Sequence, residues 1–220
     1  IKKLSDMYYN GLLNCKRLEN LISKDYLNKN IIYFHGILIP RRRVEDLIEA
    51  FRIIREDPEC PETMLVLSGS TSFDRKYYEK IIKLISKYKL NRDVAILGEI
   101  DNETLACMYA ISKVFVWPCH RQTWGIAPLE ALLFGTPIVV SKTSGVSEVI
   151  SDKVGVIVEP LSPEELYKGI KTILCNTSRE RFDDSVLRRL VIEKYTYYHT
   201  GMYFLSLIKL VSSGNLYRRR

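Results

Sequence analysis

Histidine is scarce in this chain of 220 residues, and its cysteines form no recognisable pattern. The three histidines, at positions 35, 120 and 199, have no His or Cys neighbour at the spacing of metal ligands. We therefore expect no metal. No other cofactor is expected either. The five cysteines are widely scattered, without a Cys-x-x-Cys pair or the even number that a disulfide framework favours. This cysteine usage predicts reduced thiols and a cytoplasmic location.

Long apolar runs are also absent. The longest are strand-sized, far below the roughly 18 residues of a membrane-spanning helix, and no signal-peptide pattern opens the chain. We expect a soluble protein with at most peripheral membrane contact. Neither Gly-x-Gly-x-x-Gly nor a Walker lysine occurs, which argues against a dinucleotide dehydrogenase and a P-loop hydrolase. Because the first residue is Ile rather than Met, we expect the chain to be trimmed or part of something longer.

Acidic residues are outnumbered, which leaves a formal charge of +7 and a pI near 9.1. This balance favours anionic partners such as nucleotide phosphates, nucleic acid or an acidic membrane surface. Basic residues cluster at 41–43 and at 218–220, and the second cluster is expected to be a solvated tail. The basic runs lack interleaved aromatic residues and any nucleic-acid reading motif, so we expect no nucleic-acid partner.

From residue 31 onward, short β-branched or aromatic runs alternate with amphipathic helical patterns. This alternation predicts an α/β fold with an open, Rossmann-like parallel sheet and helices on both faces, over residues 31–178. The expected strands are 31–35, 64–68, 94–97, 114–117, 138–141 and 154–158. Residues 1–30 are predicted to form a helical lead-in or linker. Residues 179–220 are predicted to form a C-terminal helical extension of two helices, broken near residues 199–201.

Capping residues indicate where the connecting helices begin. Asp101 or Asn102 is expected to cap one helix, and Ser162 with Glu165 forms a capping box that begins another. A further helix is expected over about 128–134. The first connecting helix has an apolar face, and three acidic residues are expected to turn outward from it: Glu45, Asp46 and Glu49.

The most informative stretch runs from residue 118 to residue 137, directly after a predicted strand. In parallel sheets, ligands bind at the carboxyl ends of strands, where loops lead into helix N-termini whose free N–H groups suit a diphosphate. Gly125 lets the backbone approach a ligand, and Glu130 can accept hydrogen bonds from the vicinal hydroxyls of a ribose. The stretch therefore predicts a nucleotide site. The alternatives are that Glu130 is a solvated helix carboxylate and that Trp124 caps the core.

The same stretch resembles the Glu-x7-Glu signature of retaining glycosyltransferases of the GT-B fold, especially family 4, the group 1 type. Glu130 corresponds to the second Glu of the signature, Gln122 to the first, and Trp124 to its aromatic residue. The resemblance implies that Glu130 holds the nucleotide ribose. It also implies that Gln122 and Trp124, with the amides after Gly125 such as that of Ile126, contact the donor sugar and phosphate.

A second segment, residues 35–51, is similar without a gap to the diphosphate-binding segment of the same family. Arg42 keeps the charge of the family's Lys, which implies a contact with the donor diphosphate. Ile37 replaces the family's Arg, so one phosphate contact is lost. Arg41 or Arg43 compensates for that contact if the loop lets either side chain reach into the site. The positions expected to line the nucleotide are Gly36, Gly69, Gly98 and Ile100.

The resemblance covers about residues 31–175. It implies the C-terminal half of a GT-B enzyme that transfers a sugar from a nucleoside-diphosphate sugar to an acceptor, with retention and without a metal. It also implies an N-terminal acceptor domain, in cis or in trans. The acceptor, whether glycan, lipid or protein, is left open, and no catalytic residue is assigned because His120 matches no catalytic position of the family. The alternative, favoured by Gln122 and Ile37, is a non-catalytic nucleotide-sugar-binding module or scaffold.

Overall fold

The computed structural model describes residues 2–11, 15–16, 18–22, 28–175 and 182–212. Its centre is a parallel sheet of six strands in the order β3-β2-β1-β4-β5-β6. The strands are β1 (Asn30–His35), β2 (Thr63–Ser68), β3 (Val94–Ile96), β4 (Val114–Trp117), β5 (Ile138–Ser141) and β6 (Gly155–Val158). All six expected strands are present, with ends that differ by no more than one residue. The predicted Rossmann-like α/β fold is confirmed.

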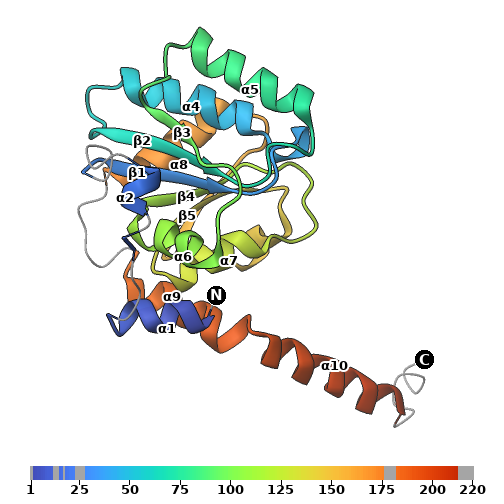
Figure 1. Cartoon of the computed structure of the whole chain (residues 1–220). Coiled ribbons are helices and arrows are strands. Elements are labelled where there is room, and N and C mark those ends of the chain that lie inside the picture. The colour runs from blue at the N-terminus through green and yellow to red at the C-terminus, as the bar shows by residue number, and fades with distance from the viewer. Residues whose placement is uncertain (1, 12–14, 17, 23–27, 176–181, 213–220) are drawn as a thin grey trace.

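Helices cover both faces of the sheet (Figure 1). One layer consists of α4 (Val44–Glu56), α5 (Arg75–Lys87) and α8 (Pro163–Leu174). The other consists of α6 (Asn102–Ile111), α7 (Ile126–Leu133) and α9 (Asp184–Lys194). Because both faces are covered, β2 and β4 are buried along their whole length, and this is why their sequences are almost continuously apolar.

The order of the strands creates one topological switch point. The chain runs outward from β1 through β2 to β3 and then returns to place β4 on the other side of β1. The connections after β1 and β4 therefore leave the sheet in opposite directions. A crevice at the carboxyl ends of these two strands is the usual ligand site of such a sheet.

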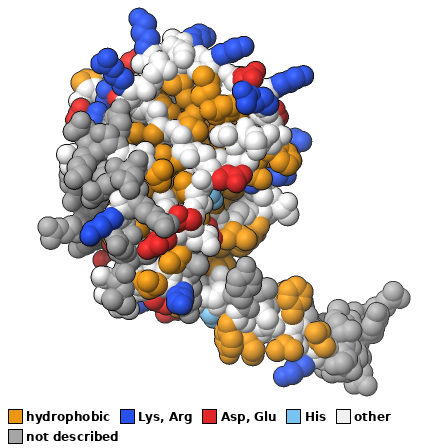
Figure 2. Space-filling view, viewed as in Figure 1, with side chains coloured by type: hydrophobic (Ala, Val, Ile, Leu, Met, Phe, Trp, Pro, Cys, Tyr) orange, Lys and Arg blue, Asp and Glu red, His pale blue; other side chains and the backbone are white. Residues whose placement is uncertain are grey.

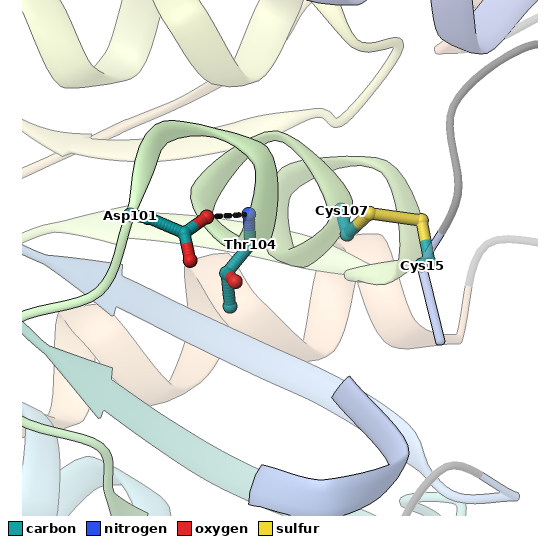
Figure 3. Close-up of a disulfide and its surroundings, with 4 residues drawn as sticks. All are labelled: Cys15, Asp101, Thr104 and Cys107. Atoms are coloured by element: carbon teal, nitrogen blue, oxygen red, sulfur yellow. Dashed lines mark hydrogen bonds between the residues drawn. A yellow bond between two sulfur atoms is a disulfide. The ribbon is translucent and has the colours of Figure 1, made fainter. Parts of the chain in front are cut away.

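The predicted helix caps are confirmed. Asp101 accepts a hydrogen bond from the Thr104 amide at 2.8 Å and begins α6 (Figure 3). Ser162 accepts one from the Glu165 amide at 3.2 Å and begins α8. Helix α7 begins at Ile126, two residues before the expected start.

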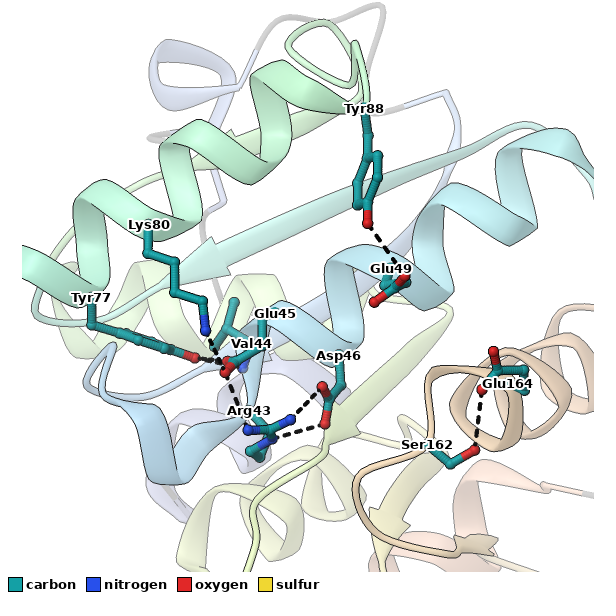
Figure 4. Close-up of polar contacts among 10 residues, drawn as sticks. All are labelled: Arg43, Val44, Glu45, Asp46, Glu49, Tyr77, Lys80, Tyr88, Ser162 and Glu164. Carbon is teal, nitrogen blue, oxygen red and sulfur yellow. Dashed lines mark hydrogen bonds and ion pairs between the residues drawn. The ribbon is translucent and has the colours of Figure 1, made fainter.

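The acidic residues at the start of α4 do not all turn outward, which corrects the prediction. Asp46 is only 5% exposed and accepts two hydrogen bonds from Arg43, at 2.9 and 2.7 Å (Figure 4). Glu45 accepts hydrogen bonds from Tyr77 and Lys80 of α5. The reason is that Arg43 pairs with Asp46 and that α5 packs beside α4 at Glu45.

In the segment predicted as a helical lead-in, the described residues form two helices, α1 (Lys2–Tyr9) and the short α2 (Leu18–Leu21). Gly11 adopts a left-handed φ of 68° after α1. The Ser5 hydroxyl donates to the Leu133 carbonyl at 2.8 Å, which holds α1 beside the end of α7.

The prediction of reduced cysteines is wrong for one pair. Cys15 and Cys107 form a disulfide across 92 positions of sequence, with Cα atoms 5.7 Å apart (Figure 3). The other three cysteines, Cys60, Cys119 and Cys175, are free. Spacing along the chain carries no trace of this pairing, because it depends on the N-terminal segment packing against α6.

The C-terminal extension consists of α9 and α10 (Tyr197–Ser212), and α10 projects away from the sheet (Figure 1). The helices are separated at Tyr195 and Thr196 rather than at the predicted 199–201. Thr196 and His199 contact each other through Oγ1 and Nδ1 at 2.8 Å, and this contact stabilises the first turn of α10. The predicted boundary after residue 178 and the basic cluster at 218–220 lie outside the described residues. In the described ranges, no helix has the length and apolar character needed to cross a membrane.

Candidate functional site

A cavity of about 940 Å³ lies at the switch point of the sheet, between the carboxyl ends of β1, β2 and β4 and the N-terminus of α7. The predicted residues that line it are Gly36, Arg42, Gly69, Ile100, Gln122, Trp124, Gly125, Ile126 and Glu130. Gly98 does not line the cavity. Its carbonyl accepts a hydrogen bond from the Gly69 amide at 2.7 Å and so supports the loop that does. The tertiary structure therefore brings together the segments that follow β1, β2, β3 and β4.

Two glycines let backbone form the cavity wall. Gly69 has a φ of 119°, and a Cβ there would lie 2.2 Å from the Gly36 carbonyl oxygen. Gly125, the N-cap of α7, has a φ of 144°, and its Cβ would lie 3.0 Å from Nε1 of Trp117. A side chain at either position would be strained and crowded. The wall near α7 is therefore backbone that a ligand can approach closely.

Arg42 is held over the ring of Trp117, which lines the same cavity. Its Cζ lies 4.5 Å from the ring centroid of Trp117, and its Nη1 donates to Oε1 of Gln122 at 3.2 Å. Its Nε is buried and has no hydrogen-bond partner among the described residues, and the same is true of Nε1 of Trp117. Stacking and hydrogen bonding together position one positive charge in the cavity.

The neighbouring arginines do not compensate for Ile37. Arg43 donates to Asp46 and lies 3.3 Å from Glu45, so its guanidinium group is engaged on α4. Arg41 is exposed and does not line the cavity. Ile37 itself lines the cavity and is 37% exposed, so an apolar side chain stands where the family has a charged one.

Glu130 lies in a corner between α6 and α7. Oε2 of Glu130 accepts a hydrogen bond from the Tyr109 hydroxyl at 3.0 Å. Burial raises the pKa of Glu130, while the Tyr109 hydrogen bond opposes that rise. Burial also raises the pKa of Tyr109, so its hydroxyl stays protonated and continues to donate. The corner therefore orients a carboxylate for hydrogen bonding to a ligand.

Three aromatic residues of the cavity were not assigned a role from the sequence. His35 and Trp117 end β1 and β4, and Phe73, which is 73% exposed, lies in the loop before α5. The sequence feature that could have identified His35 and Trp117 as cavity residues is their position at the ends of predicted strands. His120 does not line the cavity, and its Nδ1 lies 3.3 Å from Oγ1 of Thr143.

Metal ligands are not gathered here. In the part of the chain that the structure describes, no group of three or more His, Cys, Asp or Glu side chains is placed to hold a metal ion. The groups of the cavity that can attract a phosphate are Arg42 and the amide groups at the start of α7.

Residues 19–186 match the family described as glycosyl transferases group 1. The chain belongs to this family. Over 171 residues, the chain is 30% identical to an uncharacterized glycosyltransferase of Methanocaldococcus jannaschii, an alignment that covers 77% of the chain and 42% of the relative. The chain thus spans less than half the length of that relative.

Solved structures of glycosyltransferases share the fold. The C-terminal domain of a group 1 family glycosyl transferase from Francisella tularensis superposes with a TM-score of 0.70 at 19% identity, covering 84% of this chain and 94% of that domain. Anabaena HepE in complex with UDP-glucose superposes with a TM-score of 0.62 at 21% identity, covering 81% of this chain and 51% of HepE. The chain therefore has the fold of the C-terminal half of a GT-B glycosyltransferase.

Proposed function

We propose that this chain is the donor-binding half of a retaining family 4 glycosyltransferase that transfers a sugar from a nucleoside-diphosphate sugar to an acceptor. The observation that carries the proposal is the convergence, in one cavity, of groups that complement each part of such a donor. Arg42 and the α7 N-terminus suit the diphosphate, Glu130 suits the ribose, and Gln122 lies beside Arg42 to meet the sugar. Anabaena HepE, which shares the fold, has been solved with UDP-glucose.

The diphosphate would bind against the start of α7 and Arg42. As the sugar leaves, negative charge develops on the nucleoside diphosphate, and preorganised donors stabilise it without rearrangement. The guanidinium of Arg42 and the amides after Gly125 supply such donors, which supports a reaction without a metal. Gln122 presents Oε1 to Arg42, and its amide nitrogen keeps two N–H donors for a sugar hydroxyl.

An additional acceptor domain, in cis or in trans, is part of the proposal. The chain spans 42% of the M. jannaschii relative and 51% of HepE. Helix α10 also exposes a group of large apolar side chains, which suits packing against another domain: Tyr198, Met202, Tyr203, Phe204, Leu205 and Ile208.

The acceptor stays unassigned. A cytoplasmic, peripheral location stays a prediction, and the Cys15–Cys107 disulfide argues against a reducing compartment.

A non-catalytic donor-binding module is the second candidate. Ile37 favours it, because this apolar side chain lines the cavity and Arg42 is the only one of the three clustered arginines to line it among the described residues. Both candidates predict binding of a nucleoside diphosphate, and only the first predicts sugar transfer.

The decisive experiment is calorimetric titration of the chain with UDP, GDP and ADP. We expect micromolar-range binding of one of them and a loss of at least 10-fold in Glu130→Ala, because the ribose hydroxyls lose a charged acceptor. Glu49→Ala is the matched control, since Glu49 also accepts a hydrogen bond from a tyrosine, Tyr88, at 3.3 Å, but lies on α4 outside the cavity. Equal affinity in the two variants, or no binding by the wild type, contradicts the proposed site.

A further inference from the structure

His35 lines the same cavity but has no role in the donor-binding arrangement described above. It is the last residue of β1 and is partly buried. Its ring lies edge-on to Tyr109, with centroids 6.4 Å apart and planes at 80°, and its Nδ1 lies 2.9 Å from Oγ of Ser68. The ring is thus fixed from two sides while the residue still faces the cavity.

The hydrogen bonds behind His35 determine which ring nitrogen carries the proton. The Tyr33 hydroxyl lies 2.5 Å from Oγ of Ser68, which in turn contacts Nδ1 of His35. Each of the two hydroxyl protons has an acceptor if the Tyr33 hydroxyl donates to Oγ of Ser68 and the Ser68 hydroxyl donates to Nδ1 of His35. We assign the neutral tautomer on this basis, with the proton on Nε2. Burial, together with the charge of Arg42, lowers the pKa of His35 to about 4, so the ring is neutral near pH 7.

We propose that His35 is a binding residue for the diphosphate of the sugar donor, to which it donates a hydrogen bond from Nε2 while taking up a proton on binding. This inference rests on the proposed function. It gives the cavity a second group that can become cationic, at the end of β1, where Ile37 supplies no charge.

The proton uptake follows from the charges around the ring. Arg42 disfavours His35 protonation. The acidic side chains that line the same cavity are Glu99 and Glu130, while Tyr33 and Tyr109 have raised pKa values and stay neutral. A diphosphate bound to Arg42 offsets the charge of Arg42 and adds negative charge beside the imidazole. The pKa of His35 must then rise on binding. The affinity for the diphosphate consequently increases as the pH falls from the pKa of His35 in the complex toward its pKa in the free chain, about 4.

The test uses sugar nucleotides, because their diphosphate has no titrating group in this pH range. The chain is titrated with UDP-glucose, GDP-mannose and ADP-glucose at pH 5.5 and 7.5, each in two buffers of different ionisation enthalpy, and the imidazole signals are followed by NMR. We expect net proton uptake at pH 5.5, affinity about 3- to 10-fold tighter there than at pH 7.5, and an upward pKa shift of one imidazole. That signal is assigned to His35 by its loss in a variant.

Two substitutions separate hydrogen bonding from protonation. His35→Gln keeps an N–H donor near the position of Nε2 but cannot titrate, so it should bind within about 3-fold of the wild type at pH 7.5 and lose the proton uptake. His35→Phe keeps a ring without a donor and should bind roughly 10-fold more weakly. His120→Gln is the matched control, because His120 also contacts a hydroxyl through Nδ1 but does not line the cavity. It should behave as the wild type.

The outcomes distinguish this inference from the proposed function. Binding that is weakened in Glu130→Ala, with no shift of the His35 signal and the same pH dependence in His35→Gln, overturns the role of His35 alone. Absence of binding by any sugar nucleotide overturns both. The NMR titration of the wild type decides the matter even if a variant fails to fold.

Discussion

At Gly69, a single methyl group is expected to disturb the cavity wall. Its φ of 119° is strained for any other residue, and a Cβ would lie 2.2 Å from the Gly36 carbonyl oxygen. We expect Gly69→Ala to lower the free energy of unfolding by about 2–4 kcal/mol, measured by denaturant titration. Gly201→Ala is the control, because among the described residues nothing outside the adjoining residues and backbone of α10 lies within 4 Å of the added methyl group. It should be neutral or stabilising by up to about 1 kcal/mol. Equal losses in the two variants would contradict this reading of Gly69.

His35 also makes stability depend on pH in the absence of ligand. Its pKa is about 4 in the folded chain against 6.5 for an unperturbed histidine, so the unfolded chain binds more protons between these values. Stability should therefore fall as the pH is lowered from about 6.5 to about 4, by about 1–2 kcal/mol after allowance for partial exposure. Glu130 acts in the opposite direction, because a raised carboxyl pKa gives stability that is lost as the pH rises through it.

The contribution of His35 is isolated by measuring the free energy of unfolding of the wild type and of His35→Gln at pH 4.5, 5.5 and 7. The difference between the two should shrink or change sign toward low pH. A constant difference across this range means that folding does not lower the pKa of His35.

The role of a residue could be predicted from the sequence where its spacing from neighbouring residues is enough to place it. Glu130 and Gly125 lie in one loop and helix, so their spacing alone places both at the start of α7. His35 and Trp117 end two strands that are 82 positions apart in sequence, and they meet only because β4 pairs beside β1. The burial of Asp46 was equally hidden, since the helical period does not reveal that Arg43 pairs with it.

At the scale of elements, the Cys15–Cys107 disulfide ties the N-terminal segment to α6 (Figure 3). It closes a loop of 92 residues, so its reduction should lower the free energy of unfolding by about 2–4 kcal/mol. Cys15→Ser should reproduce that loss and abolish the effect of reductant, whereas Cys60→Ser, which removes a free thiol, should not. Thiol titration of the unfolded chain should find three thiols before reduction and five after it, and five in both states would exclude the disulfide.

At the scale of the whole molecule, α10 presents an uncovered apolar surface. Figure 2 shows its hydrophobic side chains on the part that projects from the body, and Phe204, Leu205 and Ile208 are each more than half exposed. We expect the isolated chain to self-associate through α10 and to bind a hydrophobic dye. The double substitution Leu205→Glu and Ile208→Glu should reduce both without lowering Tm, because α10 does not belong to the packed core.

Ser206→Glu is the control for added charge, since it places a carboxylate on the same exposed helix and removes no apolar side chain. It should leave most of the association intact in analytical ultracentrifugation. Reduced association in Ser206→Glu to the level of the double variant would show that charge, rather than apolar contact, governs the behaviour.

The sequence alone determined the fold class, the six strands, the helix caps and the segments that carry the donor-binding motifs, because periodicity and capping act over a few neighbouring residues. Only the tertiary structure decided which residues meet across the switch point. It placed Arg42 against Trp117, supported Glu130 with Tyr109, added His35 to the cavity, and joined Cys15 to Cys107. The physical reason is that each of these contacts joins residues from different elements. Their distance depends on strand order and helix packing, which no local pattern encodes.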